Sequence, residues 1–376
     1  MTCVARVLAL SAQLVATVAT VALAGSGAGC SKFGTSSDEP PADAGPATDG
    51  PAPDTGAPAQ PHRIYVFGGV NTTAGSPLTT ASFSTIGPDG ELGEFMPAPT
   101  LASERTAAAW AQNGKALFAA GGGVPGTALA ADGVRTDLAD DPASIRGWTM
   151  ITSLKTARRY PAAAVDATSV YVSGGRNATT ALQNIERFDP STNTWAAAGS
   201  LPLAVAAHTT FIRDSQLYVV GGDQLGTPDK LSGAVMRTRF SSDGSAGAWE
   251  DVGALKSAVA RHAMALVEPW LFVIGGDGGT TTVATVQRGT FSADGLLTWE
   301  IDNPLDVPKD QPGLAEACAV VVDRTIYVMG GRDKNLADAK DIVYIGRLDA
   351  TGKLGWKQST TRLLEPRAAF GCAVSP

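Results

Sequence analysis

The sequence predicts an all-β protein made of six small antiparallel sheets arranged around an axis, a six-bladed β-propeller. A short hydrophobic strand followed by two glycines occurs six times, and a large aromatic residue follows each pair at a similar spacing. The copies recur about every 50 residues, a period that is typical of propellers. The first glycines of the pairs are Gly68, Gly121, Gly174, Gly221, Gly275 and Gly330. The six strands are Ile64–Phe67, Ala116–Ala120, Val170–Ser173, Leu217–Val220, Leu271–Ile274 and Ile326–Met329, and the six aromatics are Phe95, Trp148, Trp195, Trp249, Trp299 and Trp356.

Each copy can be interpreted as four strands that follow one another. The hydrophobic segment is rich in Val, Ile, Tyr and Leu without helical spacing, which predicts a buried strand. The glycine pair lets the backbone turn where a side chain would contact the neighbouring sheet. Further on, Asp-Gly or Thr-Gly pairs at 89–90, 243–244, 294–295 and 351–352, and the segment 189–193 of the third copy, predict tight hairpins before the aromatic strand. Such a unit is too small to be stable alone, so the copies must stack face to face.

The two ends of the repeat region predict how the ring closes. The chain enters at Ile64 directly on a Gly-Gly strand, without the inner strand that precedes this strand in the other copies. Residues Arg367–Val374 look like such an inner strand, and no Gly-Gly strand follows them. The C-terminal strand should therefore pair into the first blade and remove two open sheet edges.

The third copy carries a family resemblance. Its residues 187–195 have the sequence Arg-Phe-Asp-Pro-Ser-Thr-Asn-Thr-Trp, after the glycine pair Gly174-Gly175. This resembles the Kelch repeat, whose pattern is an Arg and a His on the inner strand, an aliphatic strand with Gly-Gly, a Tyr-Asp pair and a Trp; Phe188 stands here in place of the Tyr. The resemblance extends over residues 63–376 and implies a Kelch-type propeller.

The resemblance also implies a set of inner-strand arginines. Arg105 and Arg158 precede their first glycines by the same spacing, which is the family position, and Arg367 is the equivalent in the closing strand. In Kelch adaptor domains such arginines lie near the mouth of the axial channel and bind acidic peptide side chains, because a guanidinium holds a carboxylate through two hydrogen bonds. We expect a one-sided anion site. The alternative is that each arginine caps carbonyl groups of a neighbouring blade.

Three polar loop residues complete the predicted ligand-binding set. The loops after the glycine pairs bring Asn177, Asp223 and Asp277 toward one face, where they suit contact with a sugar or peptide and equally suit solvated turns.

The histidines and cysteines indicate structure more than chemistry. His208 and His262 share one spacing from their glycines, the usual family position, and are expected to be structural donors. The copper site of Kelch-built galactose oxidases would need two His, two Tyr and a crosslinked Cys, for which the supply is thin, so we expect no metal and no cofactor. Cys318 lies one residue after the usual His position of its copy, and Cys372 lies two residues after it. Because side chains alternate along a strand, this difference predicts that the two cysteines point to opposite strand faces. Two buried thiols are favoured over a disulfide.

The N-terminal segment, residues 1–62, predicts export and a lipid anchor. Residues 1–29 form a signal peptide with Arg6 before the apolar run Val7–Ala24. Gly27-Ala28-Gly29-Cys30 resembles the bacterial lipobox, although Gly27 replaces the usual Leu, and the resemblance implies lipidation of Cys30. Ordinary signal cleavage is the alternative. Ser31 after the Cys implies the outer membrane, and residues 30–62 are typical of a disordered tether rich in Pro, Ala and Asp.

Composition narrows the function without identifying it. The formal charge of −7 and only three His argue against a nucleic-acid binder. We expect a monomeric binding module of the cell envelope, with a protein or carbohydrate ligand. The alternatives are a scaffold in an envelope complex and a carbohydrate-active enzyme of the mutarotase or epimerase type, with Glu104, Arg105, Arg158, Glu316 and Arg367 as its polar set.

Overall fold

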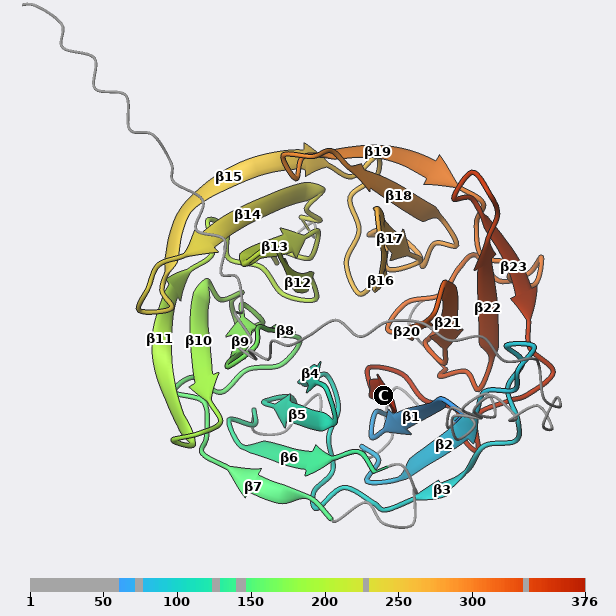
Figure 1. Ribbon diagram of the computed structural model, residues 1–376, viewed down its shortest axis with the longest axis horizontal. Coiled ribbons are helices and arrows are strands. Elements are labelled where there is room, and N and C mark those ends of the chain that lie inside the picture. The colour runs from blue at the N-terminus through green and yellow to red at the C-terminus, as the bar shows by residue number, and fades with distance from the viewer. Residues whose placement is uncertain are drawn as a thin grey trace, which may run out of the picture. The chain divides into compact units, whose positions relative to one another are not determined.

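The computed structural model is a closed ring of six four-stranded antiparallel sheets (Figure 1). It describes residues 61–71, 77–123, 129–139, 147–225, 230–333 and 338–375. All regular elements of this part of the chain are strands. The prediction of an all-β, six-bladed propeller is confirmed. The signal peptide, Cys30 and the tether up to residue 60 lie outside the described residues.

In blades 2 to 6 the chain runs from the innermost strand to the outermost, whereas blade 1 takes its innermost strand from the C-terminal segment. Blade 1 contains β1 (Arg63–Phe67), β2 (Ala81–Thr85), β3 (Met96–Ala98) and β24 (Gly371–Val374). Blade 2 contains β4 (Ala109–Asn113), β5 (Ala116–Ala120), β6 (Gly133–Asp137) and β7 (Thr149–Ile151). Blade 3 contains β8 (Ala162–Val165), β9 (Val170–Ser173), β10 (Asn184–Asp189) and β11 (Thr194–Ser200). Blade 4 contains β12 (Thr209–Arg213), β13 (Gln216–Val220), β14 (Ala234–Phe240) and β15 (Ala246–Ala254). Blade 5 contains β16 (Ala263–Val267), β17 (Trp270–Ile274), β18 (Val286–Phe291) and β19 (Leu297–Asp302). Blade 6 contains β20 (Cys318–Val322), β21 (Thr325–Met329), β22 (Val343–Leu348) and β23 (Leu354–Gln358).

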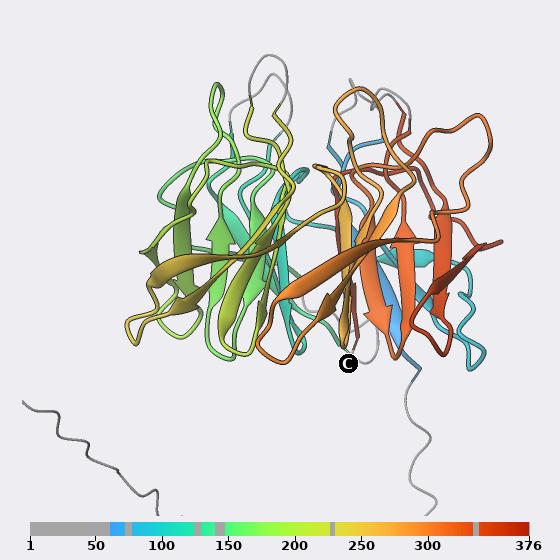
Figure 2. The same ribbon diagram turned by 90° about the horizontal axis from the view of Figure 1, so that it is seen from above.

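The two ends of the ring differ in what they carry. The six glycine pairs lie at one end, which we call the glycine face. The described chain begins and ends at the other, the terminal face, where the amide of Arg63 donates to Ser375 Oγ (2.9 Å). Figure 2 shows the C-terminus at the lower edge of the ring and the connecting loops of the glycine face at the upper edge.

The core consists of the contacts between adjacent blades. Along β17, residues Leu271–Ile274 are at most 1% exposed, because each blade lies between two others and its second strand is covered on both faces. The glycine pairs permit this packing: Gly121 has φ +67°, and a Cβ there would lie 2.8 Å from the Arg158 carbonyl oxygen of the next blade. A side chain at this position is therefore excluded both by conformation and by space.

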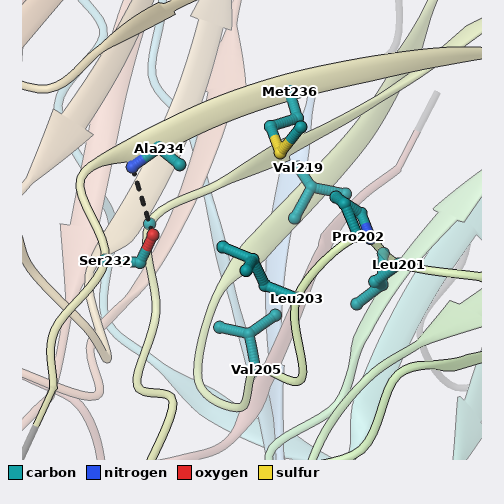
Figure 3. Close-up of a pocket in the computed structure, with 9 residues that line it drawn as sticks. Leu201, Pro202, Leu203, Val205, Val219, Ser232, Ala234 and Met236 are labelled. Atoms are coloured by element: carbon teal, nitrogen blue, oxygen red, sulfur yellow. Dashed lines mark hydrogen bonds between the residues drawn. The ribbon is translucent and has the colours of Figure 1, made fainter. Parts of the chain in front are cut away.

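Packing between blades 3 and 4 leaves a small apolar cavity (Figure 3). Its volume is about 20 Å³, enough for about one water molecule. Within its lining, the Ala234 amide donates to Ser232 Oγ (3.1 Å) and the Gly221 amide donates to the Ala234 carbonyl (3.0 Å). The side chains other than Ser232 are aliphatic or Met236. This cavity is a packing gap, too small for an organic ligand.

The ring closes as the sequence predicts. Strand β24 pairs antiparallel with β1, from Ile64 opposite Val374 to Phe67 opposite Gly371. The strand is shorter than the predicted Arg367–Val374 because the preceding residues leave the sheet, and Ala368 instead makes an isolated bridge to Val70. N- and C-terminal segments thus share blade 1.

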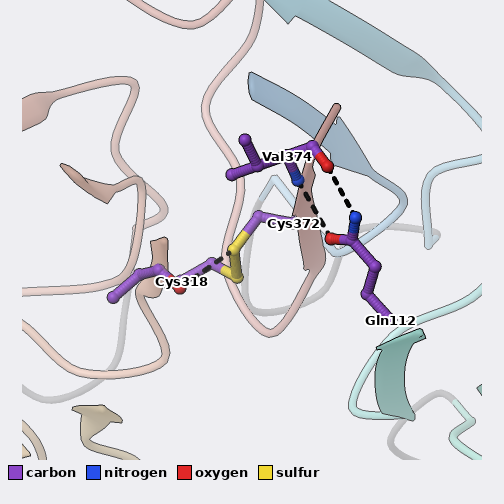
Figure 4. The surroundings of a disulfide bond; sticks show 5 residues. Gln112, Cys318, Cys372 and Val374 are labelled. Atoms are coloured by element: carbon purple, nitrogen blue, oxygen red, sulfur yellow. Dashed lines mark hydrogen bonds between the residues drawn. A yellow bond between two sulfur atoms is a disulfide. The ribbon is translucent and has the colours of Figure 1, made fainter. Parts of the chain in front are cut away.

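The prediction of two free thiols is wrong. Cys318 on β20 and Cys372 on β24 form a disulfide with a Cα–Cα distance of 6.1 Å (Figure 4). Both residues are half-buried. The argument from strand offset failed because the two strands belong to neighbouring blades, whose relative rotation and register decide which side chains meet.

On its other side β24 contacts blade 2. The Gln112 side-chain amide donates to the Val374 carbonyl (2.5 Å), and the Val374 amide donates to Gln112 Oε1 (3.1 Å). The closing strand is therefore bound to three blades, through a ladder, a disulfide and a side-chain pair.

Candidate functional site

One residue from each blade forms a ring around the propeller axis. Each of these six residues lies two positions before the first residue of an innermost strand, and all have left-handed backbone angles, with φ between 49° and 57°. The amide of each donates to the carbonyl of its equivalent in a neighbouring blade at 2.7–2.9 Å, and the circuit closes from Ala107 to Ala369. Six backbone donors and six acceptors thus satisfy one another beside the channel. This axial ring consists of Ala107, Tyr160, Ala207, Arg261, Glu316 and Ala369.

The long side chains of the axial ring cross the channel. Tyr160 and Glu316 belong to blades 3 and 6, which stand opposite each other, and Tyr160 Oη donates to Glu316 Oε1 at 2.8 Å. Arg261 Nε lies 3.4 Å from the same oxygen, and its guanidinium stacks 5.5 Å above the Tyr160 ring. Burial and the Glu316 charge raise the pKa of Tyr160, so the phenol keeps its proton and remains a donor. This Tyr160–Glu316 bridge spans the axial channel.

Two further charged residues join this bridge from the glycine face. Arg332 Nε lies 3.0 Å from Glu316 Oε2, and Arg261 Nη1 lies 2.5 Å from Asp277 Oδ2. Arg332 and Asp277 occupy the same position in their copies, two residues after the first glycine. The mouth of the channel is therefore lined by an ion-pair network built on equivalent positions of several blades.

A cavity of about 120 Å³ lies on the axis at this network. It is lined by the axial ring and by the residue that follows each ring member, among them His208, His262 and Phe370. His208 Nε2 is 2.9 Å from Ser173 Oγ, and His262 Nε2 is 2.9 Å from Thr209 Oγ1. Both hydroxyls belong to the preceding blade, so each imidazole links two blades, which agrees with the predicted structural role.

The environment of the two histidines keeps them uncharged. Burial lowers the pKa of His208 to about 3, with smaller contributions from the charges of His262 and Arg158. Burial also lowers the pKa of His262 to about 4. Near neutral pH both imidazoles are neutral hydrogen-bonding groups.

The three predicted arginines lie inside their blades. Arg105, Arg158 and Arg367 are 3%, 0% and 1% exposed. Each donates through Nη1 to two carbonyl groups of one blade, that of the first glycine and that of the residue before or at the start of the third strand. The pairs are Gly121 (2.7 Å) and Asp132 (3.2 Å) for Arg105, Gly174 (2.9 Å) and Asn184 (3.1 Å) for Arg158, and Gly68 (2.8 Å) and Thr80 (3.3 Å) for Arg367.

Each of these arginines also has an acidic partner, Asp132, Glu186 or Glu365 respectively. Burial lowers the pKa of Arg158, and the charge of Glu186 opposes this. The structure therefore agrees with the alternative that these arginines cap backbone carbonyl groups. The capped carbonyls lie in the arginine's own blade, whereas the alternative expected those of a neighbouring blade. Ligand binding by these three residues stays a prediction and would require these contacts to change.

The three predicted loop residues have different surroundings. Asn177 Oδ1 accepts from the amides of Thr179 (2.9 Å) and Thr180 (2.8 Å) and caps its own turn. Asp223 is 3% exposed and accepts from the Leu225 amide (2.7 Å). Asp277 alone of the three has an ion pair with the axial network, through Arg261.

The structure does not gather the mutarotase-type set either. Glu316 lies in the axial network, where it accepts from Tyr160. Arg105, Arg158 and Arg367 are held inside their blades by the carbonyl groups that they cap. The predicted polar set is therefore divided between the channel and the interior of the blades.

Two arginines of blade 3 that sequence reasoning missed lie at the mouth. Arg159 and Arg176 exchange backbone hydrogen bonds of 3.0 and 2.8 Å, and both are half-buried. Their Nε atoms are buried without a hydrogen-bond partner, and no described acidic side chain forms an ion pair with either residue. Burial and the charges of Arg159 and Arg261 lower the pKa of Arg176, only partly opposed by Asp223. One signal was available: Arg176 stands two residues after its first glycine, as Asp277 and Arg332 do.

Two features are absent from the described residues. No group of three or more His, Cys, Asp and Glu side chains there could hold a metal ion. That part of the chain also contains no helix with the length and apolar character needed to cross a membrane.

Comparison with known proteins agrees with the fold. The Kelch motif family matches residues 157–202, a segment that includes Arg159 and Arg176. Kelch-like protein 35 of Mus musculus is 28% identical over 198 residues, which are 50% of this chain and 29% of that protein. Kelch-like protein 26 of Danio rerio is 24% identical over 178 residues, 47% of this chain and 27% of that protein. The chain thus spans less than a third of the length of these relatives.

A solved structure has the same architecture. The protein described as "Structure of YjhT" superposes with a TM-score of 0.59 at 17% sequence identity, covering 72% of this chain and 88% of that chain. The fold and the matches support a Kelch-repeat propeller.

Proposed function

We propose that this protein is an exported, lipid-anchored binding module that binds a carboxylate group of a protein partner at the glycine-face mouth of its axial channel. The observation that carries the proposal is the pair Arg159 and Arg176, two partly buried guanidinium groups that form no ion pair with a described acidic side chain.

The energetics of the mouth favour an anionic ligand. Arg176 lies within the influence of the Arg159 and Arg261 charges, and the lowered pKa expresses the cost of placing these positive charges together away from water. A carboxylate between Arg159 and Arg176 would relieve this repulsion and accept hydrogen bonds from the unused N–H groups. Behind it, the Tyr160–Glu316 bridge forms a floor that keeps the ligand at the mouth.

The export part of the proposal rests on the sequence before residue 61. A short positive segment, an apolar run and small residues before Cys30 support signal cleavage and lipidation. The described chain enters the propeller at the terminal face, so the proposed site lies at the opposite end of the ring from residue 61.

Lipidation is tested by labelling. Cells that express the full chain or its Cys30→Ala variant are grown with radiolabelled palmitate, and membrane and soluble fractions are compared. We expect label and membrane retention for the full chain and neither for the variant. Unlabelled, soluble full-length protein would contradict the anchor and leave the binding site unaffected.

The binding site is tested with an acidic peptide and its amide counterpart. We expect the purified full chain in detergent micelles to bind a Glu-rich peptide and not the same peptide with Gln. Because hydrogen bonds to charged groups contribute about 1.5–3 kcal/mol, Arg176→Ala should weaken binding by at least tenfold. Arg239→Ala is the control, since Arg239 is an exposed arginine on β14. Equal binding of both peptides would count against the proposal, and preference for a uronic or sialic acid would replace the protein partner with a glycan.

A further inference from the structure

The described blades share a contact that we call the arginine clasp. In four of them an arginine on the third strand reaches the outer hairpin of the next blade and donates to a backbone carbonyl there. The clasps are Arg187 Nη1 to Asp243 O (3.0 Å), Arg237 Nη1 to Asp294 O (2.6 Å), Arg288 Nη1 to Thr351 O (3.1 Å) and Arg347 Nη2 to Asp89 O (2.9 Å).

The clasp requires a glycine in the bound hairpin. In all four hairpins the accepting residue precedes a glycine with φ between 75° and 80°. A Cβ at Gly244 would collide with Arg187 Nη1, and one at Gly295 would collide with Arg237 Nη1. In these two clasps the guanidinium occupies the space that a side chain would need, and a Cβ at Gly352 would instead collide with Trp270. In all four the positive φ favours glycine, so the clasp recognises a turn of the form residue-Gly.

Blade 2 has the arginine without the turn. Arg135 on β6 lies opposite Phe118 in the ladder, as Arg288 lies opposite Phe272 in blade 5. The outer hairpin of blade 3, Pro190–Asn193, contains no glycine. Among the described residues no hydrogen bond joins Arg135 to this hairpin; its ion pair is with Asp137 on its own strand, at 3.2 Å.

The Arg135–Asp137 pair leaves the guanidinium accessible. The two side chains are 39% and 62% exposed, so their attraction is screened by water. The guanidinium lies 5.6 Å above the Phe118 ring, which holds it in place. Arg135 is therefore preorganised for an acceptor that blade 3 does not supply.

A groove lies beside Arg135, lined in part by the outer hairpin of blade 3. Its volume is about 560 Å³, within the usual range of ligand pockets. Arg135 and Arg187 line it together with the hydroxyl-bearing Thr168 and Ser191 and with Pro190. Figure 1 shows β6 of blade 2 beside β10 of blade 3, the two strands that carry these arginines.

We propose that this groove docks a protein partner that inserts a residue-Gly turn, with Arg135 donating to the carbonyl that precedes the glycine. The four clasps define the chemistry of the occupant, because a third-strand arginine binds such a turn at each of them. Arg187, Arg237 and Arg288 have the register of Arg135, and Arg347 lies two residues further along its strand. The four residue-Gly turns of these clasps are already bound within the ring, and the proposed occupant is a turn of another molecule. The groove lies toward the terminal face, apart from the mouth formed by Arg159 and Arg176.

The test uses a turn that the protein already recognises. A fluorescein-labelled, backbone-cyclised peptide with the sequence of residues 240–246, which contains the Asp243-Gly244 turn, is titrated with the full chain in detergent micelles, and fluorescence polarisation is measured. We expect saturable binding, weakened at least tenfold by Arg135→Ala and unchanged by Arg239→Ala. The peptide with Ala in place of the glycine of its Asp-Gly turn should bind at least tenfold more weakly than the parent.

A second variant tests whether the peptide binds in the groove while Arg135 stays intact. Ser191 is exposed at the groove, and Ser191→Trp should block the peptide while Arg135 is intact. Thermal unfolding of each variant checks that the propeller is folded. Absence of peptide binding to the unaltered chain, or equal binding to Arg135→Ala, would overturn the proposal. A chain dimer that Arg135→Ala dissociates would overturn it in favour of a second copy as the occupant. Arg176→Ala should leave peptide binding unchanged, so this result is independent of the mouth.

Discussion

Arg158 and Arg159 are neighbours in the sequence, and their surroundings differ in nearly every respect. Arg158 is fully buried, donates to two carbonyls and pairs with Glu186 inside blade 3. Arg159 is half-buried at the channel mouth, beside Arg176, with no acidic partner in the described chain. One arginine is a structural member of the fold, and the other has binding capacity left for a ligand. The residue type alone therefore does not indicate function; the state of its hydrogen-bond donors does.

The largest expected effect comes from removing the closing segment, which carries Arg367, the third buried arginine. Deleting residues 362–376 removes β24, its ladder with β1 and the disulfide to blade 6. We expect loss of cooperative unfolding and rapid proteolysis, measured by calorimetry and limited digestion. A truncated chain with an unchanged melting temperature would contradict the role of this strand.

The comparison is tested directly by two adjacent alanine substitutions. Arg158→Ala leaves Glu186 buried without its partner and should lower the free energy of unfolding by about 3–5 kcal/mol. Arg159→Ala removes no ion pair and should change it by about 0.5 kcal/mol or less. Chemical denaturation of both variants measures the difference, and similar losses would show that the two arginines do not differ in role.

The disulfide should have an intermediate effect. It joins residues 54 positions apart, and breaking it by reduction or by Cys372→Ser should lower the free energy of unfolding by about 2–4 kcal/mol, because the unfolded chain gains freedom. Cys318→Ser is the matched control and should give the same loss. Unequal losses would mean that one cysteine contributes through packing instead.

Stability should also depend on pH because of the buried histidines. The pKa of His208 is lowered to about 3 and that of His262 to about 4 in the folded state, whereas an unfolded histidine has a pKa of about 6.5. The unfolded chain therefore binds more protons, so stability is full above a pH of about 6.5 and falls as the pH decreases toward about 4. Denaturation at several pH values should show this slope, and it should be reduced in His208→Gln. A slope identical in the variant would remove His208 as its source.

Much of the fold was predictable, because its signals are local. The six glycine pairs, the apolar strands before them and the hairpin residues after them each occupy a few adjacent positions, and their period predicts the blades. The closing strand was predictable because the first copy lacks an inner strand and the last inner strand lacks a Gly-Gly strand after it. The disulfide was not, because Cys318 and Cys372 meet across two blades whose register the strand offsets do not contain.

The candidate site was predictable only in part. Asp277 was expected at the glycine face and does lie in the axial network. The Tyr160–Glu316 bridge joins residues 156 positions apart, and it exists because blades 3 and 6 stand opposite each other. The arginines expected from the repeat pattern lie inside the blades, while Arg159, one residue further on, lies at the mouth.

The sequence by itself determined the number of blades, the boundaries of the repeats and the strand that closes the ring, because turns and strand periodicity depend on neighbouring residues. Only the tertiary structure decided which charged side chains are paired and which remain available to a ligand. Pairing depends on distances across and between blades, and a shift of a single position moves a side chain from the interior of a blade to the mouth of the channel.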